Sequence, residues 1–161
     1  MEIFANRRNR LIKMAKDGVI IIPAAHATIR NNDVEYEFRQ NSSFWYFSGF
    51  EEPDAVMVLD ANSNKPYTMF VNPKDSQISI WVGERIGIDR IVADFGADFG
   101  IPINNLREEL SKITSKHQCI YYALGSDNFL DPIIQDIVTQ RSIAFDKTGI
   151  NPICLKDPKP L

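Results

Sequence analysis

The sequence predicts a single α/β domain in which helices flank a mixed β-sheet. Segments with a strand pattern alternate with helical segments of ten or more residues, and this order is typical of a layered α/β architecture. Two of the strand segments are separated only by a short turn, so we expect them to form a hairpin. A hairpin requires antiparallel pairing, and the sheet is therefore expected to be mixed rather than purely parallel.

The first predicted helix spans about Ile3–Asp17. Its apolar residues recur at helical spacing and form one stripe: Phe4, Leu11, Ile12 and Ala15. The arginine and lysine residues between them are expected to face solvent. Gly18 stands where a C-terminal helix cap is expected.

Three strands are predicted in the first half of the chain. Val19–Ile22 is β-branched throughout and is ended by Pro23, which favours a central strand covered on both faces. Ala55–Leu59 and Tyr67–Val71 flank a segment rich in Asn, Asp, Ser and Pro, the residues of a turn. These two strands are the expected hairpin.

A second helix is predicted at about Asn105–Lys116, with apolar residues on or near one face. Asn105 and Glu108 have the spacing of a capping pair, which satisfies free N–H groups at a helix start. Cys119–Leu124 is predicted as the next strand because it is a short, mostly apolar run.

A third helix is predicted to begin at Asp131-Pro132, with the aspartate as N-cap and the proline at the first helical position. The last segment, Asn151–Leu161, has three prolines and no periodicity. It is therefore predicted to be a linker.

Composition excludes several classes of function. The 161-residue chain has a net charge of −3, which gives no support for general binding to nucleic acid. The longest apolar run, Val19–Ala25, is too short to span a membrane, and the charged N-terminal segment lacks the apolar core of a signal peptide. We expect a cytoplasmic protein whose two cysteines, Cys119 and Cys154, are buried thiols.

The motifs of common catalytic sites are absent from the sequence. It contains no HExxH, Gly-x-Ser-x-Gly, GxGxxG or phosphate-loop pattern. Its two histidines, His26 and His117, are far apart, and its acidic residues follow no metal-binding spacing. We therefore expect no catalytic residue and no metal site in this chain.

The most unusual stretch is rich in aromatic residues between positions 36 and 50. Four of them are consecutive, Phe44–Phe47, and are predicted to form a buried strand with both faces covered. The planar polar side chains of Arg39, Gln40 and Asn41 come just before them. These side chains either hold the loop in place or face a ligand.

A second unusual stretch is Ile80–Gly87, where Trp81 stands near two glycines and Arg85. Glycine at this density is typical of a loop. An exposed tryptophan usually contacts something, so a contact role for Trp81 and a place in the core are both open.

The segment Phe38–Val56 resembles the signature of the aminopeptidase P N-terminal domain, which typically reads Tyr-Arg-Gln-Asn-Ser-Asp-Phe-Trp-Tyr-Phe-Thr-Gly-Phe followed by Glu-Pro-Glu-Ala. Ile80–Gly87 is similar to the family's Ile-Trp-Phe-Gly-Arg-Arg segment, and the early Arg-Arg-Asn-Arg-Leu helix also fits. The resemblance covers about residues 5 to 155. Small departures occur at Glu37, Phe38 and Ser43.

The resemblance implies a creatinase/prolidase-like N-terminal fold over residues 1–155, with residues 156–161 starting a linker. It implies a separate C-terminal catalytic domain that holds two manganese ions and acts on peptides with proline at the second position. The chain alone is then expected to be inactive, to need that catalytic domain as its partner, and to belong to a homo-oligomer. Trp81 is implied to reach a neighbouring active site as a substrate-binding residue, with Arg39 as a weaker candidate.

Two other interpretations remain open. One is a free-standing α/β module that binds peptides or a protein partner, and the other is the same domain from a prolidase. An independent metallohydrolase is disfavoured, because two scattered histidines and unpatterned acids offer no dinuclear site.

Overall fold

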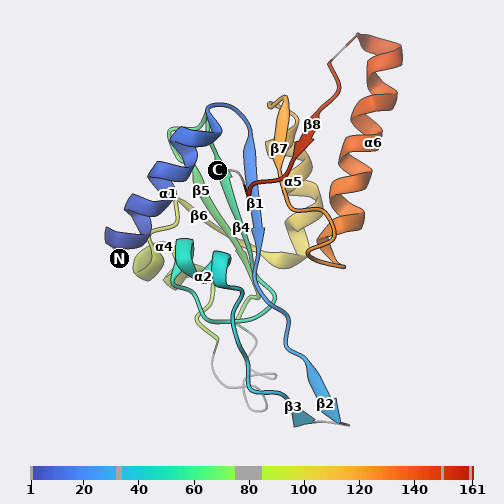
Figure 1. The fold of residues 1–161 in the computed structure, drawn as a ribbon. Coiled ribbons are helices and arrows are strands. Elements are labelled where there is room, and N and C mark those ends of the chain that lie inside the picture. The colour runs from blue at the N-terminus through green and yellow to red at the C-terminus, as the bar shows by residue number, and fades with distance from the viewer. Residues whose placement is uncertain (1, 32–33, 75–84, 150, 160) are drawn as a thin grey trace.

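A six-stranded mixed sheet lies between two layers of helices in the computed structural model, which describes residues 2–31, 34–74, 85–149, 151–159 and 161 (Figure 1). The strand order is β6-β5-β4-β1-β7-β8. The strands of this sheet are β1 Val19–Pro23, β4 Val56–Asp60, β5 Tyr67–Val71, β6 Phe99–Pro102, β7 Cys119–Tyr121 and β8 Cys154–Lys156. The helices are α1 Glu2–Ala15, α2 Ser42–Ser48, α4 Ile88–Phe95, the short 3-10 helix η1 Ile103–Asn105, α5 Leu106–Thr114 and α6 Leu130–Thr148.

The predicted hairpin and the predicted central strand are both confirmed. β4 pairs with β5 antiparallel, and β1 lies between β4 and β7 with all five of its residues buried. The pairs β1–β7, β5–β6 and β7–β8 are parallel, so the sheet is mixed as expected.

The two faces of the sheet carry separate apolar clusters. In β1, Ile20 and Ile22 face the cluster that includes residues of α1, α2 and α4, whereas Val19 and Ile21 face the cluster with α5 and α6. This alternation follows from the two-residue period of a strand. It explains why β1 is apolar at every position.

A second, two-stranded sheet extends away from the main sheet (Figure 1). It consists of β2, Ile29–Asn31, and β3, Val34–Glu35, which pair antiparallel. The side chains of Ile29, Val34 and Tyr36 are exposed there. No sequence pattern predicted this hairpin, α4 or β6.

The first helix ends differently from the prediction. Its last residue is Ala15, and the left-handed residue that follows it is Lys16, with φ 57°. Gly18, with φ 117°, instead lies beside β7, where an added Cβ would come within 2.6 Å of the Cys119 carbonyl oxygen. Arg8 also differs from the prediction, because it is buried rather than solvent-facing.

Both predicted capping arrangements in the second half are wrong. The Asn105 side chain makes no capping hydrogen bond at the start of α5. At α6 the capping carboxylate is that of Asp127, which accepts hydrogen bonds from the backbone N–H groups of Phe129 and Leu130. The carboxylate of Asp131 instead accepts from the hydroxyl of Tyr122.

The predicted linker at residues 151–161 contains strand β8. β8 pairs in parallel with β7, and the N–H of Cys154 donates to the Gln118 carbonyl at 2.7 Å. Cys154 is exposed rather than buried, while Cys119 is buried as expected. The prolines do not prevent this pairing, because they flank the paired residues and leave the N–H groups of those residues free to donate.

Within the described residues no helix has the length and apolar character needed to cross a membrane.

Candidate functional site

The consecutive aromatic residues form a helix and not the predicted strand. α2 begins after Asn41, whose side chain accepts hydrogen bonds from the N–H groups of Ser43 and Phe44. It ends at Gly49, a left-handed residue with φ 67° whose N–H donates to the Trp45 carbonyl. An asparagine N-cap and a glycine C-cap outweigh the strand preference of the aromatic side chains between them.

The helical period sends the side chains of α2 in three directions. Phe44 and Ser48, four residues apart, are buried in the core. Ser43 and Phe47 face a pocket beside β1, and Trp45 and Tyr46 line an open pocket on the outside. A strand would have presented only two faces, so the helix gives this short segment access to two separate hollows.

Two arginines of α1 hold the end of α2. Arg7 donates to the carbonyl of Tyr46 at 2.9 Å, and Arg8 donates to the carbonyl of Phe47 at 2.8 Å. These cations complement the free carbonyls at a helix C-terminus. The Arg8 guanidinium also lies 3.8 Å from the ring centre of Tyr67, and burial raises the pKa of that tyrosine to about 12.

Gln40 fixes the loop that precedes α2. Its side-chain oxygen accepts from the N–H of Ala25 at 2.7 Å and from that of Asn41 at 2.9 Å. Its amide nitrogen donates to the carbonyls of Phe50 and Glu52. Gln40 and Asn41 therefore hold the loop in place, one of the two roles that the sequence left open.

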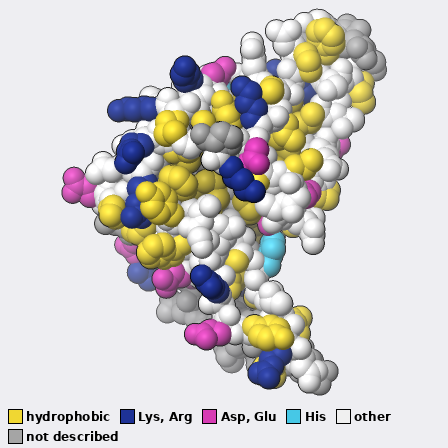
Figure 2. Space-filling view, viewed as in Figure 1, with side chains coloured by type: hydrophobic (Ala, Val, Ile, Leu, Met, Phe, Trp, Pro, Cys, Tyr) yellow, Lys and Arg dark blue, Asp and Glu magenta, His cyan; other side chains and the backbone are white. Residues whose placement is uncertain are grey.

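Arg39 differs from its two neighbours because its side chain is exposed and lines the open pocket of about 610 Å³. Within the described residues Arg39 has no hydrogen bond and no ion pair. The rest of the lining is Phe38, Gln40, Ser42, Trp45, Tyr46 and Glu51. Figure 2 shows hydrophobic side chains gathered over the region of α1 and α2, with lysine and arginine side chains among them.

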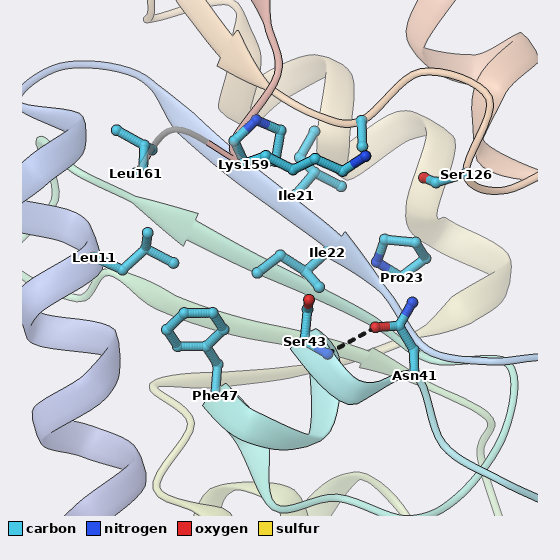
Figure 3. Close-up of a pocket in the computed structure, with 12 residues that line it drawn as sticks. Leu11, Ile21, Ile22, Pro23, Asn41, Ser43, Phe47, Ser126, Lys159 and Leu161 are labelled. Atoms are coloured by element: carbon cyan, nitrogen blue, oxygen red, sulfur yellow. Dashed lines mark hydrogen bonds between the residues drawn. The ribbon is translucent and has the colours of Figure 1, made fainter.

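The pocket beside β1 has a volume of about 410 Å³ and is mostly apolar (Figure 3). Leu11 of α1, Phe47 of α2 and Ile22 of β1 converge on it. The C-terminal segment contributes Lys159 and Leu161 from the opposite side. No motif in the sequence pointed to this pocket, since its lining comes from segments more than a hundred residues apart.

Trp81 lies outside the described residues, so its predicted contact role stays a prediction. The described part of the Ile80–Gly87 stretch begins at Arg85. There the N–H of Ile86 donates to the Glu52 carboxylate at 2.6 Å. The Ile80–Gly87 stretch therefore contacts the segment that directly follows the aromatic stretch, through the Ile86–Glu52 hydrogen bond.

His26 joins two aspartates that the sequence did not connect with it. Its Nδ1 lies 2.6 Å from Asp54 and its Nε2 lies 2.9 Å from the buried Asp127. Burial alone would lower the pKa of His26, but the hydrogen bonds and charges of Asp54 and Asp127 outweigh burial and raise it. His26 thus links three loops as a structural residue.

The described residues do not fit a metal centre. No group of three or more His, Cys, Asp or Glu side chains in that part of the chain could hold a metal ion. His117, buried between Asp17 and Asp60, lies 3.0 Å from the Asp60 carboxylate. His117 and His26 occupy separate sites, each with its own pair of aspartates.

Comparison with known proteins identifies related chains. Residues 4–121 match the family described as aminopeptidase P, N-terminal domain. The Xaa-Pro aminopeptidase of Escherichia coli (strain K12) is 33% identical over 134 residues, a match that covers 81% of this chain and 30% of that protein.

Solved structures agree with this match. The aminopeptidase PepP of Pseudomonas aeruginosa superimposes with a TM-score of 0.85 at 33% identity, covering 96% of this chain and 35% of that one. Zinc-substituted aminopeptidase P from E. coli in complex with product gives a TM-score of 0.89 at 28% identity, covering 99% and 37%. The chain therefore spans about a third of the length of the relatives it matches.

Proposed function

This chain belongs to the aminopeptidase P N-terminal domain family, and from that premise we propose that it is the accessory domain of a manganese-dependent Xaa-Pro aminopeptidase. The observation that carries the proposal is the family match over residues 4–121 together with the coverage of only about a third of each relative. In this proposal the parent enzyme removes the N-terminal residue that precedes proline. Catalysis belongs to a C-terminal domain of the same protein, and the whole is a cytoplasmic homo-oligomer.

The described residues support an accessory role. They contain no cluster that fits the two manganese ions, so no step of peptide hydrolysis is assigned to them. They do offer an open pocket with Arg39 and two half-exposed aromatic rings, Trp45 and Tyr46. Exposed aromatic and arginine side chains are the types enriched at protein contacts. We propose that this domain shapes the mouth of the active site and contributes oligomer contacts.

The first test is hydrolysis of an Xaa-Pro-containing tripeptide by the purified chain with added Mn²⁺. We expect no turnover above that of buffer, because the proposal places the metal ligands in another domain. Turnover that co-purifies with the chain and is abolished by a chelator would show that a metal site lies within it, and the accessory role would fall.

A second test addresses Trp81 in the full-length enzyme. If its indole limits which peptides enter, Trp81→Ala should change kcat/KM for longer peptides more than for tripeptides. Arg39→Ala is tested in the same way, because Arg39 is the weaker candidate for a substrate-binding residue. Unchanged kcat/KM at every peptide length would contradict a role for Trp81 at the entrance.

A free-standing module that binds peptides or a partner is the second candidate, favoured by the exposed guanidinium of Arg39 in the open pocket. The reading frame of the gene distinguishes the two. A frame that continues beyond Leu161 into Asp, His and Glu metal motifs supports the accessory domain, whereas a stop codon there supports the module. The substrate preference of that longer protein would then separate aminopeptidase P from prolidase.

A further inference from the structure

The two cysteines of the chain are partners in the sheet. Cys119 and Cys154 occupy the same register position in the parallel pair β7–β8. Side chains at one register position point to the same face, and the Cα atoms of neighbouring strands lie about 4.8 Å apart, within the range of about 4.4–6.8 Å that a disulfide spans. Both thiols are free in the structure.

Their surroundings differ in a way that suits stepwise oxidation. Cys154 is exposed at the edge of the sheet, whereas Cys119 is only 7% exposed. An oxidant in solution therefore reaches Cys154 first, and the only other cysteine lies beside it. Lys156 follows two residues later, and its ammonium lies 5.7 Å from the ring centre of Tyr121, the register partner of Lys156.

The charge of Lys156 acts on the buried thiol as well. Burial raises the pKa of Cys119, the charge of Lys156 opposes that rise, and the neighbouring Cys154 adds to it. The lysine thus offsets only part of the effect of burial on Cys119. Cys119, Tyr121, Cys154 and Lys156 thus form one cluster on one face of β7–β8.

We propose that Cys119 and Cys154 are an oxidation site, which a hydroperoxide converts into an intramolecular disulfide between β7 and β8. The Cys154 thiolate attacks one oxygen of the hydroperoxide, the O–O bond breaks, and the departing oxygen takes a proton from solvent. The products are a sulfenic acid and an alcohol, or water from hydrogen peroxide. The Cys119 sulfur then attacks the sulfenic sulfur, the S–S bond forms, and the hydroxyl leaves as water with the Cys119 proton. The two thiols lose two electrons in total and the hydroperoxide gains two.

The disulfide fastens the last strand to the sheet. β8 is a strand of three residues at the edge of the sheet, next to β7. A bond across this pair closes a loop that includes the whole of α6. Closing a long loop lowers the conformational entropy of the unfolded chain and so stabilises the folded state. Oxidation is therefore expected to raise Tm by about 5–10 °C.

The test treats the purified chain with hydrogen peroxide, blocks the remaining thiols with iodoacetamide under denaturing conditions, and digests it with trypsin. We expect mass spectrometry to find residues 117–141 joined to residues 148–156, both thiols lost together, and Tm raised until dithiothreitol reverses it. Cys154→Ser, a change at an exposed position, should abolish the link and the rise in Tm. Cys119→Ala should instead accumulate a sulfenic acid at Cys154 that dimedone traps.

Two outcomes would overturn the proposal. One is irreversible oxidation of Cys154 while Cys119 remains available to iodoacetamide. The other is a covalent dimer through Cys154, reversed by reductant, without the intramolecular link. Both would show that the two sulfurs do not meet within one chain.

Discussion

Single side chains fasten loops that the sequence leaves far apart. His26 contacts Asp54 and Asp127, and the latter lies 101 positions further along the chain. Gln40 makes four hydrogen bonds to backbone groups of the surrounding loops. The side-chain type supplies the hydrogen-bonding groups, but the local sequence does not indicate which residues will be their partners.

The first prediction concerns the pH dependence that His26 causes. Its pKa is raised on folding above its ordinary value of 6.5, so its stabilising effect is fully present below about pH 6.5 and is lost as pH rises through the folded pKa. His26→Gln should therefore lower Tm more at about pH 5.5 than at pH 9. The side chain is half exposed, so the effect at low pH should not exceed about 1 kcal/mol, or about 2–4 °C.

Thermal melts of both proteins across this pH range measure the effect. Lys13→Gln, at an exposed position of α1, is the control and should give the same difference in Tm at each pH. An equal loss at every pH for His26→Gln would show that His26 contributes packing alone.

The second prediction compares two adjacent residues. Gln40→Met keeps the size of the side chain but leaves two N–H groups and two carbonyls without their partner, which should cost about 2–3 kcal/mol of unfolding free energy. Arg39→Met at the neighbouring exposed position should change it by less than about 0.5 kcal/mol. Urea denaturation measures both, and a cost for Arg39→Met as large as that for Gln40→Met would show that Arg39 holds the fold.

At the scale of elements, α2 shows how caps decide a short segment. Its aromatic residues suit a strand, yet Asn41 and Gly49 supply a helix start and a helix end only a few residues apart. Gly49 also lies against Phe4 of α1, and Phe4 in turn packs edge-on against Trp45 at 5.9 Å between ring centres. The C-terminal cap of α2 is thus part of the surface that packs against α1.

The third prediction tests that contact. An added Cβ at Gly49 would lie 2.6 Å from the Phe4 ring at a φ of 67°, whereas Gly125, with φ 87°, has nothing within 4 Å. Both Gly49→Ala and Gly125→Ala carry backbone strain of about 1 kcal/mol, but only Gly49→Ala adds a steric clash of about 1–3 kcal/mol. Urea denaturation should therefore show the larger loss for Gly49→Ala, and equal losses would mean that Phe4 moves aside freely.

At the scale of the whole molecule, the C-terminal segment belongs to the sheet. The N–H of Tyr122 donates to the Lys156 carbonyl at 2.9 Å, and the side chain of Ile153 is buried in the α5–α6 cluster. Leu161 lies against the cluster on the opposite face. The C-terminal segment therefore packs against the apolar clusters on both faces of the sheet.

The fourth prediction is a pair of truncations. A chain ending at residue 152 loses β8 and the burial of Ile153, and should lose about 2–4 kcal/mol of unfolding free energy. A chain ending at residue 157 keeps both, and should lose less than about 1 kcal/mol. Urea denaturation of the two chains decides whether β8 is part of the folding unit, since equal stability of both would make it a peripheral strand.

The sequence by itself determined the α/β class, the central strand, the β4–β5 hairpin, the helices α1, α5 and α6, and the family. These rest on local periodicity, turn residues and two short motifs, which are properties of neighbouring residues. Tertiary structure alone decided that Arg8 is buried under α2, that β8 joins the sheet, and that His26 meets Asp127. Each of these depends on partners brought together by folding of the whole chain, and no local pattern records which distant residues will meet.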